Sequence, residues 1–415
     1  MIFMLRGSSL YSVVVLSLVI GLATTALMSV AFFYRSENTK NFLFERLERN
    51  AQSGMALILG GNDSLAFAEE QKLDLFGQET DSVLIKKDHW GLFEYGITKA
   101  FSGKYSSAKA ALFGYKKNND DAALFLADQS RPLSLCGSTF IKGTCFLPKA
   151  GVKRAFIEGE SYSGGELING AVKSSDNSLP ALNKNYKERL ITVFKSGITE
   201  KTDTVDIASD TIRRSFLEET LILRSDSLLR NKCYSGNIIL FSKRTIVIDP
   251  SCSLHDILIF ASSVIIKDGF KGSLQAFAKD SLVVGDHCDL KYPSGLGLIK
   301  IDVKTKQPFI SIGEKTKIKG IVFSTQDYAD IQQTKISIGK GTVITGQVYA
   351  EGFLELKGMV YGNVCCNKFT LKTPASVYEN HLLNVTIDSS KLPDYYVGSS
   401  LIYSNNKKEI AKCLE

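Results

Sequence analysis

Hydrophobic and polar positions follow three different patterns along the chain. The first is an apolar run from Leu10 to Tyr34, and no formal charge lies between Arg6 and Arg35. A helix rises about 1.5 Å per residue, so this run is long enough to cross a hydrocarbon core of about 30 Å. It is also longer than the apolar part of a cleaved signal peptide. We therefore predict a transmembrane helix over residues 10–34, after a short leader or cytoplasmic tail over residues 1–9.

The second pattern is helical and follows the apolar run directly. Apolar residues recur at spacings of three and four before Gly60-Gly61, namely at Phe44, Leu47, Ala51, Met55 and Ile58. This spacing places them on one face of a helix, and glycine commonly ends helices. We predict a stalk helix over residues 35–61. No second long apolar run occurs, so we expect the rest of the chain on one side of the membrane, outside the cytoplasm, in the periplasm or at the cell surface.

The third pattern is an internal repeat. Residues 310–322 (ISIGEKTKIKGIV) align without gaps on residues 336–348 (ISIGKGTVITGQV), with 8 of 13 positions identical and an offset of 26 residues. Degenerate copies begin at Ile246 and Leu282. Further apolar triplets begin at Val264 and Leu354, each 18 residues from a flanking copy. Fixed periods of this size are typical of solenoid proteins.

Alternating apolar residues within each copy predict short, half-buried strands. A β-sandwich would also show alternation and turns, but it would not require gapless copies with glycine in register. We therefore predict a mainly β chain with a parallel β-helix (solenoid) over residues 233–373. The glycines expected at its corners are Gly313, Gly320, Gly339, Gly346, Gly352, Gly358 and Gly362.

The remaining segments are less regular. We expect residues 62–132 to be a mixed α/β linking region, with a helix between Gly96 and Lys116. Residues 133–232 have a β texture and are expected to form early rungs of the solenoid, with an inserted loop and a helix from Tyr186 to Gly197. Residues 374–415 are expected to cap the open edge of the last rung.

Charge and composition limit the function without identifying it. The 50 Lys and Arg residues are interleaved with 43 Asp and Glu residues, which gives a net charge of +7. This mild excess argues against nucleic acid as a partner. Hydrophobic residues make up 44% of the chain, which excludes a largely disordered protein.

Eight cysteines offer few candidate sites. Cys136 and Cys145 are nine residues apart, a spacing that suits a disulfide across a hairpin or between adjacent rungs. Cys252 and Cys288 occupy the place of threonine in the repeat, where they can equally stack as buried, unlinked side chains. No cysteine or histidine spacing matches a zinc site, so we expect no metal and no cofactor.

Candidate catalytic chemistry is sparse, and we expect no enzymatic activity. The four histidines lie far apart without a triad pattern. Only His287, beside Asp286 and Asp289, is a candidate general acid or base, and the alternative is an ordinary surface histidine. If the solenoid instead binds or modifies polysaccharide, the exposed aromatic side chains expected to stack on sugar rings are Tyr292, Tyr328 and Tyr349.

The N-terminus resembles type IV pilins and pseudopilins, most of all the divergent minor pilins. A very short leader ends in Arg6-Gly7 and is followed by Ser8-Ser9-Leu10 and an apolar helix. The resemblance implies processing between Gly7 and Ser8. It covers about 50 residues and departs from the family at Ser12, where pilins typically carry glutamate at the fifth mature position.

A second resemblance lies in the repeats. Residues 344–364 (ITGQVYAEGFLELKGMVYGNV) are similar to the repeat of bactofilins, the polymer-forming β-helical scaffold proteins of bacteria. This resemblance implies a structural role, no cofactor and end-to-end stacking. Bactofilins lack the long N-terminal half and the transmembrane segment of this chain.

We therefore expect a membrane-anchored structural or assembly protein of the bacterial envelope, pilin-like or pseudopilin-like, that presents a rigid β-helix to partners. The expected partners are the membrane, other envelope or pilus-like proteins, and copies of the same chain through the β-helix or the anchor helix. One alternative is a β-helix protein that binds or modifies polysaccharide. The other is a membrane-tethered, bactofilin-like cytoskeletal scaffold.

Overall fold

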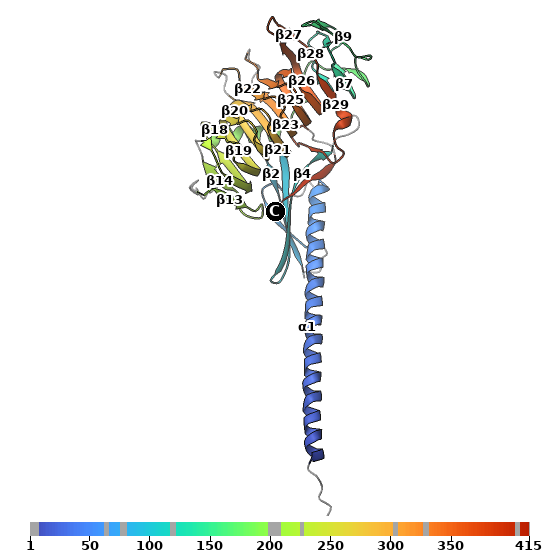
Figure 1. Ribbon diagram of the computed structural model, residues 1–415, viewed down its shortest axis with the longest axis vertical. Helices are drawn as coiled ribbons and strands as arrows, with labels where there is room; N and C mark the ends of the chain where they lie inside the picture. Colours follow the sequence, from blue (N-terminus) through green and yellow to red (C-terminus); the bar gives the residue numbers. More distant parts are fainter. Residues whose placement is uncertain are drawn as a thin grey trace, which may run out of the picture. The chain divides into compact units, whose positions relative to one another are not determined.

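A computed structural model shows a mainly β chain with one long N-terminal helix (Figure 1). The described residues are 8–61, 66–74, 81–116, 122–197, 209–224, 228–301, 306–326, 332–402 and 407–414. They divide into two compact units. The first contains the chain through Ala56 together with Glu70–Ile85 and Thr98–Lys109, and the second contains the remaining residues.

The helix α1 runs without a break from Ser8 to Leu59. Its apolar segment continues directly into the predicted stalk. The helix ends where Gly61 adopts a φ of +68°, a conformation that glycine tolerates better than other residues. The Gly61 N–H donates to the Ile58 carbonyl at 3.3 Å, which satisfies one of the last free carbonyls of the helix.

In the first unit, the second half of α1 packs against parts of a sheet. In that sheet the strands follow the order β1-β2-β3-β4-β30, and β31 also pairs with β4. The bounds are β1 Glu70–Leu73, β2 Ser82–Trp90, β3 Phe93–Ser102, β4 Tyr105–Lys116, β30 Val397–Gly398 and β31 Lys408–Leu414. Inside the unit, the Thr98 hydroxyl donates to the Ala51 carbonyl at 2.9 Å, and Arg46 pairs with Asp81 at 2.8 Å.

The helix predicted between Gly96 and Lys116 is wrong, because this segment forms the end of β3 and all of β4. Its alanines fall at intervals that imitate a helical face. A tight turn at Gly103, with a φ of +56°, breaks the segment into two strands. The residues of β4 from Ala110 to Tyr115 are all buried, so this strand lacks the alternation of apolar and polar residues by which a half-buried strand is recognised in a sequence.

The second unit contains a large closed sheet whose pairings are parallel among its described strands, apart from that between β26 and β27. Its strands are β5 Leu124–Leu126, β7 Phe140–Lys142, β8 Cys145–Leu147, β12 Val172–Ser174, β13 Thr211–Arg214, β14 Leu221–Arg224, β15 Leu228–Leu229, β16 Cys233–Gly236, β17 Ile238–Phe241, β18 Thr245–Ile248, β19 Ser253–Ile266, β20 Lys271–Val284, β21 Asp289–Lys300, β22 Phe309–Ile312, β23 Lys317–Gln326, β24 Lys335–Ile338, β25 Val343–Leu356, β26 Met359–Lys372, β27 Val377–Glu379 and β29 Thr386–Asp388. Smaller elements are β6 Leu133–Cys136, β9 Val152–Arg154, β10 Phe156–Ile157, β11 Glu160–Ser161, β28 His381–Leu383, α2 Lys184–Ser196 and a 3₁₀ turn at Ser389–Lys391.

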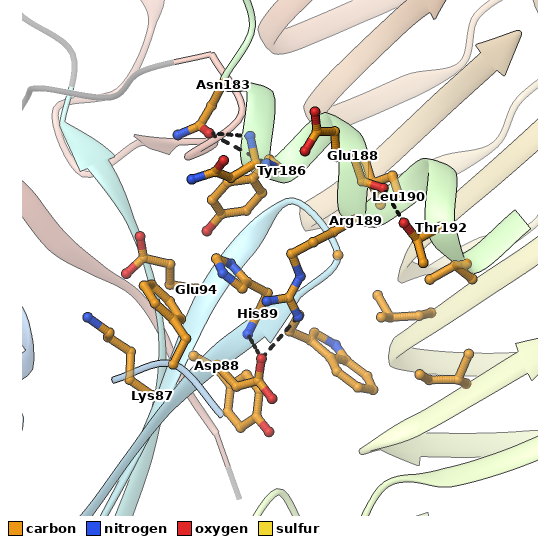
Figure 2. A pocket seen from close by; sticks show the side chains of 18 of the residues that line it. Lys87, Asp88, His89, Glu94, Asn183, Tyr186, Glu188, Arg189, Leu190 and Thr192 are labelled. Atoms are coloured by element: carbon orange, nitrogen blue, oxygen red, sulfur yellow. Dashed lines mark hydrogen bonds and ion pairs between the residues drawn. The ribbon is translucent and has the colours of Figure 1, made fainter. Parts of the chain in front are cut away.

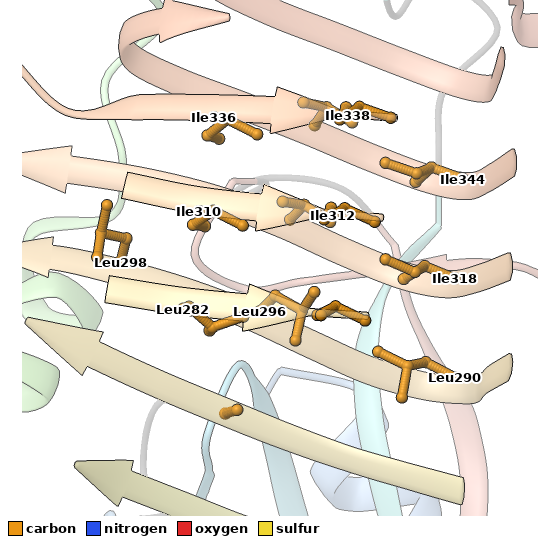
Figure 3. Packing of buried hydrophobic residues seen from close by; sticks show 14 of the residues in the cluster. Leu282, Leu290, Leu296, Leu298, Ile310, Ile312, Ile318, Ile336, Ile338 and Ile344 are labelled. Atoms are coloured by element: carbon orange, nitrogen blue, oxygen red, sulfur yellow. The ribbon is translucent and has the colours of Figure 1, made fainter. Parts of the chain in front are cut away.

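The repeats found in the sequence lie side by side in this sheet. Ile310 pairs with Ile336, and Ile318 pairs with Ile344, so the 26-residue offset is a strand register. The 18-residue offset is also a register, since Ile336 pairs with Leu354. The repeated isoleucines form a buried column, shown in Figure 3, that removes apolar surface from water along the whole stack.

The order of the strands differs from the prediction. Strand β5 pairs with β26, with Val364 opposite Leu124, and β8 and β12 follow beyond β5. The N-terminal strands therefore come after the C-terminal ones, and the expectation that residues 133–232 supply early rungs is wrong for β6 to β12. The strand β26 pairs with β5 at residues 364–366, and β29 and β27 of the C-terminal segment pair with its two ends, so residues 374–415 cover part of this edge. Similar strands can pair in either order, so similarity alone does not reveal the order.

The predicted corner glycines serve two steric purposes. Gly320, Gly346 and Gly362 stack on one another with φ between +143° and +149°, and a Cβ on any of them would strike the carbonyl of the preceding stacked residue. The others have ordinary φ values, but neighbouring backbone or carboxylate atoms lie too close for a side chain; they are Gly313, Gly339, Gly352 and Gly358.

A second hydrophobic layer lies on the other face of these strands. Phe260 and Phe277 stack with ring centroids 4.8 Å apart, and they alternate with small residues of the first core. Trp90 and Leu92 at the β2–β3 turn pack in this layer, together with Tyr186 and other residues of α2. Because this outer face is covered, its aromatic side chains are core residues rather than an exposed surface.

Candidate functional site

A cavity of about 870 Å³ lies within the second unit, beside the second hydrophobic layer. It is lined by α2, by residues 87–95 around the β2–β3 turn, and by residues of β17 and β19. Figure 2 shows side chains from α2 and from β2 converging on His89. The volume falls in the range of pockets that hold small organic ligands.

His89 lies at the polar end of the cavity, between two aromatic rings. Phe67 stacks on its imidazole with centroids 4.4 Å apart, and Tyr186 meets it edge to face at 4.3 Å. Its Nδ1 is buried and makes no hydrogen bond to any described residue. Burial first, and then the positive charges of Arg189, Lys408 and Lys87, together lower the pKa of His89 to about 3. The imidazole is therefore neutral at physiological pH.

Two ion pairs border the imidazole. Arg189 reaches Asp88 at 3.1 Å, and the same carboxylate accepts the backbone N–H of His89 at 2.7 Å. Lys408 reaches Glu94 at 2.7 Å, and the Glu94 side chain is only 4% exposed. Burying the Glu94 carboxylate without Lys408 would be costly, so this pair holds its part of the cavity wall in place.

Helix α2 places Tyr186 over the cavity. The Asn183 side chain accepts hydrogen bonds from the N–H groups of Asn185 and Tyr186, which caps the start of the helix. Tyr186 is 4% exposed, and its hydroxyl lies at hydrogen-bonding range of the Ser400 side chain. Burial raises the pKa of Tyr186 well above its ordinary value, so the phenol keeps its proton.

The other end of the cavity is apolar. Leu190 and Val193 of α2 line it together with Ile239, Leu258 and Phe260 of the sheet. Trp90 lies along the same wall and donates from Nε1 to the Asp256 carbonyl at 2.9 Å. The lining of the cavity therefore combines charged and polar side chains with apolar ones.

This arrangement is better suited to binding than to proton transfer. A general base works best when its pKa lies near the working pH, and that of His89 lies far below it. Among the described residues, no group of three His, Cys, Asp or Glu side chains is placed to hold a metal ion.

The predicted polysaccharide groove is not formed by the tyrosines named for it. Tyr292 donates its hydroxyl to the Val397 carbonyl at 2.9 Å, and Tyr349 is 2% exposed and donates to the Pro180 carbonyl. The expectation that they are exposed is wrong, because α2 and the C-terminal segment cover them. Tyr328 lies outside the described residues.

His287 is exposed at a corner between β20 and β21, with a φ of +56°. Its neighbour Asp286 accepts the Glu314 N–H at 2.7 Å and so stabilises the corner. Asp289 starts β21 and pairs in register with Lys271. These three residues are spread over a rung corner and do not converge on a pocket of their own.

The cysteines are all free thiols. Cys136 packs with Ile157 and Leu371, whereas Cys145 belongs to the main column of the parallel sheet, so the structure does not support a disulfide between them. Burial raises the pKa of Cys145 to about 12. Cys252 and Cys288 are buried and unlinked, and the Cys288 N–H donates to the Thr316 hydroxyl of the next copy at 3.1 Å.

Of the predicted processing residues, Gly7 lies outside the described part of the chain and Ser8 is the first residue of α1. The cavity was missed by sequence analysis. Its walls come from three segments that are separated in the sequence, namely residues 87–95, α2 and strands β17 and β19, and no motif links them. The one available signal was the tripeptide Asp88-His89-Trp90, which contains the only tryptophan of the chain.

No protein-family model and no curated protein matches the chain. Among solved structures, the chain is similar to the competence-associated pilin ComZ from Thermus thermophilus, with 10% sequence identity over 85% of this chain and 88% of that one. The TM-score is 0.27, which is too low to support an argument about fold or function.

Proposed function

We propose that the chain is a single-pass, membrane-anchored structural or assembly component of a bacterial envelope, of a pilin-like kind. The observation that carries this proposal is the first half of α1. Among the described helices, it alone is long and apolar enough to cross a membrane. Its most apolar stretch has a mean hydropathy of 2.4, and no residue of that stretch is buried.

The exposed side chains of this segment are large and apolar. Leu22 is 64% exposed, Leu27 is 70% exposed and Phe32 is 76% exposed. Leaving such surface in water is unfavourable by roughly 25 cal/mol per Å². Lipid or the apolar helices of partner subunits would remove that cost.

Polar groups in the segment are compatible with lipid. The helix satisfies its own backbone hydrogen bonds, as a spanning element requires. Its hydroxyls fold back onto the helix, since Ser17 donates to the Val14 carbonyl and Ser29 to the Thr25 carbonyl, both at 2.9 Å. Few polar atoms in the segment therefore lack a partner when water is removed.

In this proposal the closed parallel sheet is a β-helix that acts as a rigid platform for other envelope or pilus-like proteins. Support comes from the continuous column of stacked isoleucines and from the stacked glycines, which hold neighbouring strands in register. The proposed role is structural, without a cofactor and without nucleic acid. The domain would lie outside the cytoplasm.

Membrane extraction and topology labelling test this proposal together. Cys413 is exposed, whereas most of the other cysteines are buried, so a membrane-impermeant maleimide applied to spheroplasts should label it from outside. Cys413→Ser is the matched control. The protein should also resist extraction by alkaline carbonate. Extraction into the soluble fraction would refute the anchor, and labelling only after lysis would place the domain in the cytoplasm, as in a bactofilin-like scaffold.

N-terminal sequencing of the same membrane fraction tests the pilin-like part. A chain that begins at Ser8 would support processing after Gly7. A chain that retains Met1 would support a plain signal anchor and would remove the pilin-like description while leaving the membrane anchor intact.

A further inference from the structure

We propose that the turn between β3 and β4 contacts the phospholipid headgroups of the membrane that α1 spans. The turn comprises residues 102–105, and Lys104 is its exposed cation. The inference rests on the membrane anchor proposed above, and it adds a second contact between the chain and the lipid surface. All residues that carry it belong to the first unit.

The end of the apolar run fixes where the membrane surface crosses α1. Phe33 and Tyr34 are exposed, and Arg35 follows them as the first charged residue of the helix. Aromatic side chains and long cationic ones gather where hydrocarbon meets headgroups. The headgroup layer therefore begins near residue 34, and it extends about 5–8 Å beyond the hydrocarbon core.

The contacts of the β3–β4 hairpin approach this level along α1. In β3, the Thr98 hydroxyl donates to the Ala51 carbonyl at 2.9 Å. Beside the turn, the Tyr105 ring meets the Phe44 ring edge to face, with centroids 5.5 Å apart. The hairpin therefore contacts earlier residues of α1 as it nears its turn, and the turn is the end of the hairpin closest to the apolar run.

The remaining distance is short. Phe44 follows Tyr34 by ten residues, which corresponds to about 15 Å along a helix. Residues 103 and 104 extend past Tyr105, and a strand advances about 3.3 Å per residue. The flexible stem of a lysine extends further still. The Lys104 ammonium group can therefore reach the headgroup layer while Tyr105 stays packed on Phe44.

The charges at the turn suit phosphate. Residues 98–109 include no acidic residue. Lys104 is exposed, and its Nζ lies 5.4 Å from the Tyr105 ring centroid rather than in an ion pair with a described carboxylate. On α1, Glu37 pairs with Lys40 at 3.5 Å, which leaves Arg35 without an ion pair among the described residues. Two cations therefore remain available to lipid phosphates at this level.

Other charges in the unit add no net positive charge to the turn. The carboxylates beside the second half of α1 are in ion pairs of their own; they are Glu45, Glu48 and Asp81. Strand β1 and the residue after it carry both signs, at Glu70, Lys72 and Asp74. Attraction to a charged surface falls off within a Debye length of about 8–10 Å. The electrostatic part of the contact therefore depends on Lys104 and Arg35.

The test uses the full chain in phosphatidylcholine nanodiscs, with tryptophan as a depth reporter. Ser106→Trp introduces an indole at an exposed position beside the turn. Gln52→Trp introduces one at an exposed position of α1 farther from the apolar run. A lipid with a nitroxide on its headgroup quenches nearby indoles, and the unmodified chain supplies the signal of Trp90, the only native tryptophan. We expect at least twofold stronger quenching of Ser106→Trp than of Gln52→Trp.

Lipid charge and lysine position then assign the contact. Adding phosphatidylglycerol to the discs should increase the quenching of the Ser106→Trp reporter, because an anionic surface attracts Lys104. Combining the reporter with Lys104→Glu should remove this increase. The matched control combines it with Lys99→Glu, the same charge change at an exposed position farther from the turn, and should retain the increase.

The outcomes separate this inference from the anchor on which it rests. A chain that does not co-elute with the discs would refute the anchor and the headgroup contact together. Incorporation into the discs with equal quenching of Ser106→Trp and Gln52→Trp would refute the headgroup contact alone. The same response in Lys104→Glu and Lys99→Glu would overturn the role of Lys104.

Discussion

The two halves of α1 have the same backbone geometry and opposite surroundings. Between residues 10 and 34 every side chain that the structure describes is exposed, although most are apolar. In the second half Leu47 and Ala51 are fully buried, while Phe42 nearby is 68% exposed. One face of the second half is therefore covered by strands of the same unit, whereas none of the described residues covers the first half.

Polar contacts follow the same division. In the second half Asn50 donates to Asp81 at 3.1 Å and Thr98 donates to the Ala51 carbonyl, so the helix is tied to the sheet. In the first half the hydroxyls of Ser17, Thr24 and Ser29 donate to carbonyls of their own helix. An apolar helix surface is stable only when it is removed from water. Strands of the same unit cover the second half of α1, and a membrane would cover the first half.

The largest expected effect comes from placing a charge in the first half of α1. Leu22→Asp should cost about 3 kcal/mol or more for membrane insertion, because a carboxylate at the centre of a spanning helix is unfavourable by about that amount. We expect the carbonate-resistant fraction to fall several-fold. The control Ser36→Asp, outside the apolar run, should leave extraction unchanged. Normal anchoring of Leu22→Asp would show that this half does not span the bilayer.

The second half should respond to loss of buried volume instead. Leu47→Ala should destabilise the packing of α1 on its sheet by about 3 kcal/mol, the usual cost for a fully buried leucine. Hydrogen–deuterium exchange of residues 44–56 should become much faster. Phe42→Ala, at an exposed position of the same helix, is the control and should not change exchange. Equal effects of the two variants would contradict the division of the helix.

Lowering the pH should reduce the unfolding free energy of the globular part and leave the helicity of the apolar half of α1 unchanged. The pKa of His89 is about 3 in the folded chain and about 6.5 when unfolded, so its contribution to stability is complete above pH 6.5 and is lost as the pH falls toward 3. At pH 4.5 the loss is about 2 kcal/mol relative to pH 7. Chemical unfolding followed by Trp90 fluorescence measures this change.

His89→Gln provides the comparison for the acid experiment. The variant should show a shallower loss of stability between pH 7 and pH 4.5, whatever its stability at pH 7. Helicity of the detergent-bound segment over residues 10–34 should stay constant, since its only titratable side chains are tyrosines. An unchanged slope in His89→Gln would show that other groups dominate the acid response.

The smallest expected effect concerns the hydrogen bond between helix and sheet. Thr98→Val removes the donor to the Ala51 carbonyl while keeping the shape, and should cost about 1 kcal/mol in unfolding free energy. Thr192→Val is the control, because the Thr192 hydroxyl bonds only within its own exposed helix turn. If both variants lost a similar amount of unfolding free energy, the loss would come from the backbone preference of valine rather than from a tertiary hydrogen bond.

Periodic features were predictable from the sequence, because they depend on neighbours along the chain. The copies at residues 310–322 and 336–348 pair in register, as their alignment predicted. The helix expected from Tyr186 to Gly197 occurs as α2, over Lys184–Ser196. The false helix between Gly96 and Lys116 shows the limit of this reasoning, since alanine spacing alone does not reveal a turn inside the pattern.

Features that depend on long-range contacts were not predictable in this way. The placement of β5 against β26 joins residues about 240 positions apart, and many similar edges were available to either strand. Tyr349 was expected on an open surface, yet the insertion that contains α2 covers it. The cavity around His89 likewise requires α2, the β2–β3 turn and the sheet to be assembled first.

By itself, the sequence determined that residues 10–34 form an apolar helix and that the repeated isoleucines occupy equivalent strand positions. Local composition and period are sufficient for both, because each follows from the geometry of a single helix or strand. Only the tertiary structure decided which half of α1 is covered by strands, where the N-terminal strands enter the closed sheet, and which polar groups meet at the cavity. Those outcomes depend on which faces and edges pair, and the same periodic pattern is compatible with several pairings.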